Sequence, residues 1–152
     1  MHPSEKYWFR NSDLGNGVQQ GEIVKAGRLL IGLDDLNPDS GLNVIPRLPA
    51  TWKRIEVEDY PVVATDLQGK NVRTNIKYKL DRIENGYSFQ IESADAIRMG
   101  QLRLGPFDTR QIVAKGGKMK STVVELRGKY YLYLDISGLQ GKKISLSAIS
   151  KN

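Results

Sequence analysis

The chain has 152 residues, a formal net charge of +6 and no cysteine. Without thiols it has no disulfide bonds, no cysteine catalysis and no cysteine-ligated zinc or iron–sulfur centre. No stretch approaches the ~20 apolar residues of a membrane-spanning helix, and the first residues lack the apolar core of a secretory signal. The length favours a single domain, and the cellular compartment is left open because a leader could have been removed.

Residues 1–21 are polar and contain glycine, with one aromatic group at Tyr7, Trp8 and Phe9. Monomers avoid exposing so much adjoining apolar area. We therefore expect an extended N-terminal arm that packs on its own domain or docks on a neighbouring subunit. Residues 22–152 are expected to form one β domain.

Short strands are expected in the first part of this domain. Glu22–Leu33 is interpreted as a strand, because Gly27 and Gly32 would interrupt a helix. Leu42–Ile45 is a second short strand, stopped by the proline that follows it.

The strongest local pattern is a β-hairpin over Asn71–Ser93, where apolar and polar residues alternate on both sides of a turn at Asn85 and Gly86. The preceding segment, residues 53–64, alternates as well. Pro61 cannot donate a ladder hydrogen bond, so this strand is predicted to lie at a sheet edge or to break there.

Two glycines interrupt the segment that follows. Ile97–Leu104 alternates in two sets that are out of step across Gly100, where a β-bulge would fit. Gly105 and Pro106 predict a turn, and residues 107–114 predict another strand. A short helix in 94–100 or 108–115 is the alternative for this region.

The last third of the chain predicts a second hairpin, Ser121–Leu126 with Lys129–Ile136, around Arg127 and Gly128. Residues 142–149 form a closing strand. In total we expect about nine short strands at roughly ten-residue spacing and at most one short helix, which is typical of an antiparallel β-sandwich or small barrel.

Catalytic machinery is not expected. His2 is the only histidine, and it lies in the terminal segment, where neither a triad nor a histidine metal site would form. The carboxylates gather in one turn-like loop and on one alternating strand, which predicts turn chemistry and a solvated face: Asp34, Asp35 and Asp39; Glu56, Glu58 and Asp59. We therefore expect a protein that is not an enzyme and has no cofactor and no metal. A hydrolase would need two carboxylates facing each other across a cleft.

Nucleic-acid binding is the alternative function. The sequence RGKYYLYLD, residues 127–135, partly resembles the basic and aromatic RNP1 strand of RNA-recognition motifs. It departs from that pattern at Lys129, Tyr130 and Leu134. The lysines of the loop KGGK could also cradle an anion. A single-stranded nucleic acid bound by a β-barrel would use Lys115, Lys118, Lys120, Arg127, Lys129, Tyr131 and Tyr133.

The favoured function is protein–protein interaction, as a subunit of an assembly or as an accessory or inhibitor protein, with another protein or its own copies as partner. Tyrosine, tryptophan and arginine dominate the energetics of protein interfaces, and an edge strand can extend the sheet of a partner. The residues expected at the interface are Tyr7, Trp8, Arg10, Trp52 and Tyr60.

Overall fold

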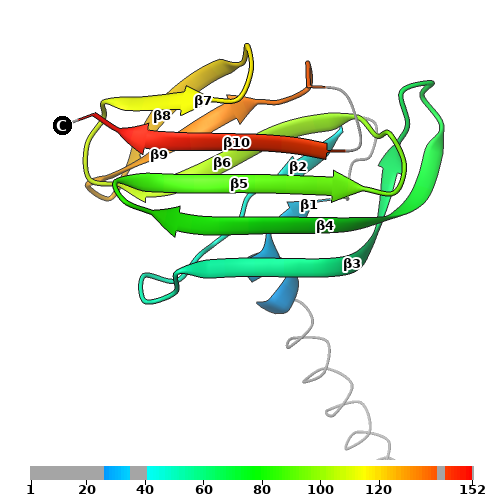
Figure 1. Ribbon diagram of the computed structural model, residues 1–152, viewed down its shortest axis with the longest axis horizontal. Coiled ribbons are helices and arrows are strands. Elements are labelled where there is room, and N and C mark those ends of the chain that lie inside the picture. Colours follow the sequence, from blue (N-terminus) through cyan, green and yellow to red (C-terminus); the bar gives the residue numbers. More distant parts are fainter. Residues whose placement is uncertain (1–25, 35–40, 140–142, 152) are drawn as a thin grey trace, which may run out of the picture.

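The computed structural model describes residues 26–34, 41–139 and 143–151. These residues form a β-sandwich of ten strands in two five-stranded sheets, with a short helical stretch at residues 26–31 (Figure 1). The predicted all-β sandwich is confirmed, and the sheets do not close into a barrel. The expected N-terminal arm, with His2, Tyr7, Trp8 and Arg10, lies outside the described residues.

The two sheets have the following strand orders. Sheet A is β1 (Leu33–Asp34), β2 (Leu42–Val44), β6 (Met99–Phe107), β9 (Lys129–Asp135) and β8 (Lys120–Leu126). Sheet B is β3 (Arg54–Thr65), β4 (Asn71–Ile83), β5 (Gly86–Ser93), β10 (Lys143–Ser150) and β7 (Ile112–Lys115). Neighbouring strands are antiparallel except for β2 and β6, which are parallel.

The core lies between the sheets and consists of the apolar residues that alternate along each strand. On sheet B, the Tyr78 ring packs against Phe89 with 5.8 Å between ring centroids. Tyr87 and Phe107 meet edge to face across the two sheets at 5.2 Å. The aromatic alternation of the predicted hairpin is therefore core packing.

Both predicted hairpins are confirmed. In the β4–β5 hairpin Ile83 pairs with Gly86, and Asn85 takes a φ of 59° in the turn. In the β8–β9 hairpin both turn residues, Arg127 and Gly128, have positive φ, at 52° and 73°. A two-residue turn with two positive φ angles is the type that matches the twist of paired strands.

The prediction of a strand at Glu22–Leu33 is wrong for residues 26–32, the part before Leu33 that the structure describes. Residues 26–31 are helical, and β1 starts at Leu33. Gly32 ends the helix: its φ is 71°, and its N–H donates to the carbonyl of Arg28 at 2.7 Å. A side chain at Gly32 would also collide with the Ile45 carbonyl, so this glycine permits close packing as well as the turn.

The turn predicted at Gly105 and Pro106 is also wrong, because β6 runs through both residues to Phe107 and the β6–β9 register shifts there. The bulge expected at Gly100 is confirmed: β6 places one extra residue between Met99 and Leu102, which pair with Leu42 and Val44. No helix forms in 94–100 or 108–115.

The two sheets have edge strands on two opposite sides of the sandwich, and these sides differ in how well the edges are covered. On the side that we call the closed side, the edges β1 and β3 lie beside the helical residues and the segment 45–53 (Figure 1). Leu33 and Leu48 are buried there. The Tyr78 hydroxyl donates to the Ile31 carbonyl at 2.5 Å, and the Ile45 and Arg47 amides donate to the carbonyls of Gly32 and Leu30. The opposite side, with the edges β7 and β8, is the open side.

Candidate binding surface on the open side

Strand β8 is the least buried long strand of the described chain. Its residues are exposed on both faces except for Val123, which is half-buried. Val124 and Leu126 are 42% and 53% exposed. Within the described residues β8 pairs with β9 alone, so its second edge has no strand beside it. An exposed edge with apolar residues is a template for another chain.

The outer face of sheet A continues this exposed strand. Register places Val124 opposite Tyr131 and Arg103 opposite Tyr133. The guanidinium of Arg103 lies over the Tyr131 ring, 5.3 Å from its centroid. We call this surface the tyrosine face, made of Arg103, Val124, Leu126, Tyr131 and Tyr133. The cation–π contact holds the Arg103 and Tyr131 side chains against each other at the surface.

Between the edges of the two sheets the core is only half covered. The apolar residues that line this seam pack against the core but stay partly exposed: Ile112, Ala114, Met119, Val123 and Leu139. On the closed side the corresponding positions are filled by the buried Leu33 and Leu48. The seam, the β8 edge and the tyrosine face adjoin one another through β8.

Positive charge is concentrated around the same strands. The stretch from Arg103 to Lys129 contains seven lysines and arginines but only two acidic residues, against a net charge of +6 for the whole chain. One of the two acids, Asp108, accepts a hydrogen bond from the Lys129 ammonium. This hydrogen bond, followed by the attraction of the same charge, lowers the pKa of Asp108. The open side is therefore basic.

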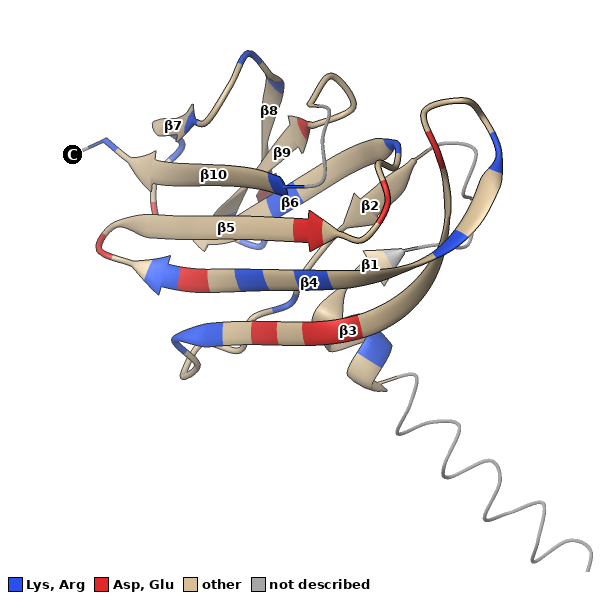
Figure 2. Cartoon of the chain, turned by 45° about the vertical axis from the view of Figure 1, so that its right-hand side comes forward, with Lys and Arg blue, Asp and Glu red and all other residues tan. Residues whose placement is uncertain are grey.

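Sheet B is different, because acidic and basic residues lie side by side on its neighbouring strands β3, β4, β5 and β10 (Figure 2). Lys143 pairs with Glu92 at 2.5 Å, Lys79 with Asp81 at 3.5 Å and Lys77 with Asp59 at 3.7 Å. The hydrogen bond from Lys143 lowers the pKa of Glu92. Such exposed pairs contribute little to stability individually, and they leave the outer face of this sheet close to electrically balanced.

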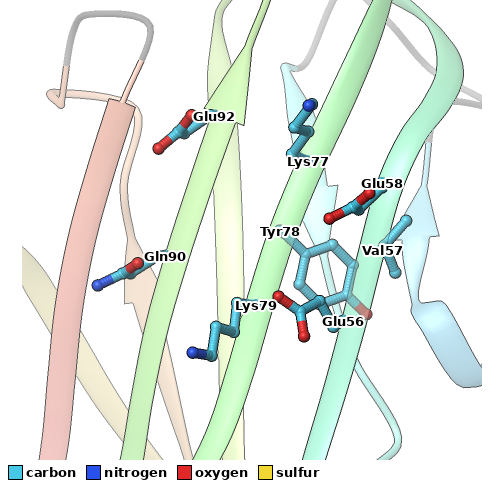
Figure 3. A pocket seen from close by; sticks show the side chains of 8 residues that line it. All are labelled: Glu56, Val57, Glu58, Lys77, Tyr78, Lys79, Gln90 and Glu92. Carbon is cyan, nitrogen blue, oxygen red and sulfur yellow. The ribbon is translucent and has the colours of Figure 1, made fainter.

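A shallow hollow of about 150 Å³ lies on this balanced face, between β3, β4 and β5 (Figure 3). The carboxylates of Glu56, Glu58 and Glu92 and the ammonium groups of Lys77 and Lys79 surround it. Glu56, Glu58 and Asp59 are exposed, as the strand alternation predicted. The hollow follows the bulge of β3, where the β3–β4 register shifts between Val57 and Tyr60.

A second hollow, of about 390 Å³, lies where the β4–β5 turn meets the end of β6. Arg82 is a charged group at its rim, and the two terminal nitrogens of its guanidinium are engaged, whereas its buried Nε has no hydrogen-bond partner among the described residues. The guanidinium donates to the carbonyls of Ala50 at 2.9 Å and Pro49 at 3.3 Å, and it lies over the Tyr87 ring at 5.7 Å. Arg82 therefore fastens the segment before β3 to sheet B.

The structure does not bring the predicted interface residues together. Trp52 is 48% exposed on the closed side, and Tyr60 is half-buried against the core, eight residues further along the chain. Tyr7, Trp8 and Arg10 lie outside the described residues. The loop with Asp35 and Asp39 is outside them as well.

By contrast, the residues predicted for nucleic acid lie in one region. Tyr131 and Tyr133 are on the outer face of β9. The five basic residues are exposed on β7, on β8, in the loop between them or at the β8–β9 turn: Lys115, Lys118, Lys120, Arg127 and Lys129. Arg103, Val124 and Leu126 were missed. The sequence carried one signal for the two apolar residues, since KSTVVEL lacks the alternation of a half-buried strand.

Among the described residues, no cluster of three or more acidic or imidazole side chains is arranged to hold a metal ion. Over the same ranges, no helix is long and apolar enough to cross a bilayer.

Comparisons of the chain with protein-family models, with curated proteins and with solved structures returned no match.

Proposed function

We propose that this protein is a non-enzymatic protein-binding module, acting as a subunit of an assembly or as an accessory or inhibitor protein, and that it binds through its open side. One observation carries the proposal. The β8 edge has no partner strand among the described residues, and it exposes Val124 and Leu126 beside a half-covered apolar seam. Contiguous apolar surface of this kind marks interaction sites on monomeric proteins.

The tyrosine face supports the same surface. Tyrosine and arginine are enriched among the residues that dominate binding energy, because they combine large contact area with a polar group. Tyr131, Tyr133 and Arg103 supply both at the centre of sheet A's outer face. Trp52 and Tyr60 do not belong to this surface. Tyr7, Trp8 and Arg10 remain predicted interface residues.

The test is whether a complex is lost when the exposed apolar residues of β8 are replaced by charged ones. We expect the chain, purified from its native cells by an affinity tag, to carry a stoichiometric partner or to form oligomers, measured by light scattering after size-exclusion chromatography. The double variant Val124→Arg, Leu126→Arg should lose that complex and keep its melting temperature. Leu67→Arg, at an exposed apolar residue in the β3–β4 turn, is the matched control. A complex that survives the double variant contradicts the proposal.

Single-stranded nucleic acid is the second candidate, favoured by one specific observation. Outward tyrosines stand among exposed lysines and arginines on the β8–β9 hairpin, and Arg103 lies over one of the rings. Single-strand binders combine stacking on aromatic rings with a basic groove along the backbone. The sheets do not close into a barrel, so binding inside a barrel is no longer part of this hypothesis. The basic face that carries the tyrosines is still available.

Fluorescence anisotropy with labelled oligothymidylate and oligouridylate tests this candidate. Binding should weaken steeply with salt, because bound phosphates release counterions. The double variant Tyr131→Ala, Tyr133→Ala should cost about 1–3 kcal/mol per stacked base. Lys70→Ala, in the β3–β4 turn, should change nothing beyond a small salt effect. An unchanged anisotropy at about 50 mM salt would eliminate nucleic acid as the partner.

A further inference from the structure

The hairpin geometry defines which backbone groups of β8 face away from β9. The two-residue turn at Arg127 and Gly128 is closed by the pair Leu126 and Lys129. Opposed residues in an antiparallel ladder alternate between bonded and non-bonded pairs. Val124 and Thr122 therefore bond to β9, whereas the N–H and C=O groups of Ser121, Val123 and Glu125 point outward. No other backbone partner is found for these three residues within the described chain.

The strand itself is well suited to accept a neighbour. It is seven residues long, contains no proline and pairs with β9 in an unbroken register. Its centre is Thr122, Val123 and Val124, three β-branched residues that favour extended structure. An added strand would extend sheet A over the seam, so its inward side chains would cover Val123 and Met119.

The charge at the ends of β8 selects the chemistry of that strand. Lys118 and Lys120 stand at its beginning, and Arg127 and Lys129 stand at the turn that ends it. Glu125 and Asp108, which accepts a hydrogen bond from Lys129, offset the charge at the turn, so the excess of positive charge lies beside Lys118 and Lys120. Charge complementarity calls for a short apolar, β-prone stretch with acidic residues at the end that lies beside these two lysines.

The same charges argue against a second copy of β8. Two-fold antiparallel pairing of two β8 edges about Val123 would place Lys120 opposite Leu126 and Lys118 opposite Gly128 of the other chain. Each end would then bring Lys118 and Lys120 close to Arg127 and Lys129 of the other chain. Glu125 and Asp108 lie near the same ends, but the basic residues outnumber these two acids. Like charges across paired strands are destabilising.

We propose that β8 receives an extended, acidic segment of a partner protein as an additional strand of sheet A. The inference builds on the protein-binding function proposed above and adds the binding mode and the partner chemistry. Main-chain hydrogen bonds to Ser121, Val123 and Glu125 give the affinity. The apolar seam and the flanking lysines and arginines give the specificity.

The probe is a synthetic fluorescein-labelled peptide, EDTVTVTDE, whose valines share one face and whose acids lie at both ends. We expect saturable binding by anisotropy and about tenfold slower amide hydrogen exchange at Ser121, Val123 and Glu125 in the bound full chain. N-methylation of alternate residues blocks one edge of the peptide. Of the two possible methylated sets, one should abolish binding and the other should preserve it.

Three protein variants complete the experiment. Val123→Pro removes an outward N–H that β9 does not use, and it should weaken peptide binding at least about tenfold. Lys118→Glu with Lys120→Glu should weaken it further, whereas Lys70→Glu should not. Should Val123→Pro fail to fold, the methylated peptides test the same hydrogen bonds on the unaltered protein.

Several results would overturn the inference: no binding of the acidic peptide, equal binding of its lysine counterpart KKTVTVTKK, binding of both methylated sets, or displacement by oligothymidylate at lower concentration. If the peptide does not bind while the double variant Val124→Arg, Leu126→Arg still loses the native complex, strand addition is wrong and the protein-binding function stands. If the native complex also survives the double variant, both proposals are wrong.

Discussion

The closed and open sides of the sandwich end in edge strands of opposite character. On the closed side, β3 has a bulge with Asp59 at a φ of 51°, carries Pro61 and exposes Glu56 and Glu58. Bulges, prolines and charges are the devices by which sheets prevent edge-to-edge pairing. On the open side, β8 is regular and lacks proline. Both sides therefore end in an edge strand, but among the described strands a long edge without these devices occurs only on the open side.

Packing differs in the same sense. Val62 of β3 is 2% exposed, whereas Val123 of β8 is only half-buried. The core is therefore covered more completely at Val62 than at Val123, and the open side retains apolar surface that a partner could bury.

The same substitution on the two edges should have unequal costs. Val62→Ala removes two buried methyl groups and leaves a cavity, so we expect a loss of about 2 kcal/mol in the free energy of unfolding. Val123→Ala should cost less than about 1 kcal/mol, because its side chain is partly solvated. Urea denaturation measures both. Equal losses would mean that the open side is packed as tightly as the closed side.

The hydroxyl of Tyr78 fastens the closed side. Tyr78→Phe removes the hydrogen bond to the partly buried Ile31 carbonyl, at a cost of about 1 kcal/mol. Burial raises the pKa of the Tyr78 hydroxyl, so it stays protonated and able to donate through neutral pH. Tyr133→Phe, on the tyrosine face, should change stability by less than about 0.5 kcal/mol. Thermal unfolding of the two variants measures both changes in stability. Equal losses would show that the Tyr78 hydroxyl does not stabilise the closed side.

Removing one protective device from β3 should make the two edges more alike. Pro61→Val restores an N–H to an exposed position of the strand. We expect a change in stability of under about 1 kcal/mol but increased self-association, read by dynamic light scattering over a concentration series. A variant that stays as monodisperse as the parent chain would show that the bulge at Asp59 protects this edge without the proline.

The smallest expected effect is a titration at the end of β9. The Ser137 hydroxyl and amide both donate to the Asp135 carboxylate, at 2.5 and 3.0 Å, and they lower the pKa of Asp135. A depressed carboxyl pKa adds stability above the unfolded-state value, near 3.9, and this stability is lost as the pH falls through the folded-state pKa.

Ser137→Ala should therefore raise the pKa of Asp135 towards its ordinary value and reduce stability slightly above about pH 4. Carbon-detected NMR titration follows each carboxyl separately. The pKa of Asp108, which is lowered by Lys129, serves as the internal control. Identical titration of Asp135 in both proteins would show that the hydroxyl has no influence.

Local features of the fold were readable from the sequence, and non-local ones were not. Alternation and the turn residues Asn85 and Gly128 predicted both hairpins, because these signals act between neighbouring residues. Gly32 led to the wrong prediction of a strand, because a glycine can interrupt a helix or mark its C-terminal end. Its close approach to Ile45 is a tertiary contact that the local sequence does not indicate. Pro106 indicated a turn, but a strand also accommodates proline at a bulge, and Pro106 lies at the register shift between Leu104 and Phe107.

The candidate site was predictable only in part. Tyr131 and Tyr133 were identified from their spacing, and their outward direction followed from the buried Leu132 and Leu134. Trp52 and Tyr60 were chosen by residue type alone, and the structure does not place them in one exposed patch. The open seam depends on which strands end each sheet, including the parallel pairing of β2 with β6, and no local pattern encodes that order.

The difference between the edges also bears on stoichiometry. β1 is two residues long, β7 is four, and β3 is guarded by its bulge and by Pro61, so β8 is the one long, regular edge among the described strands. A molecule with a single receptive edge can terminate a run of strands contributed by others, but it offers no second edge for growth. Sheet-based contacts through β8 would therefore yield finite one-to-one complexes in place of filaments.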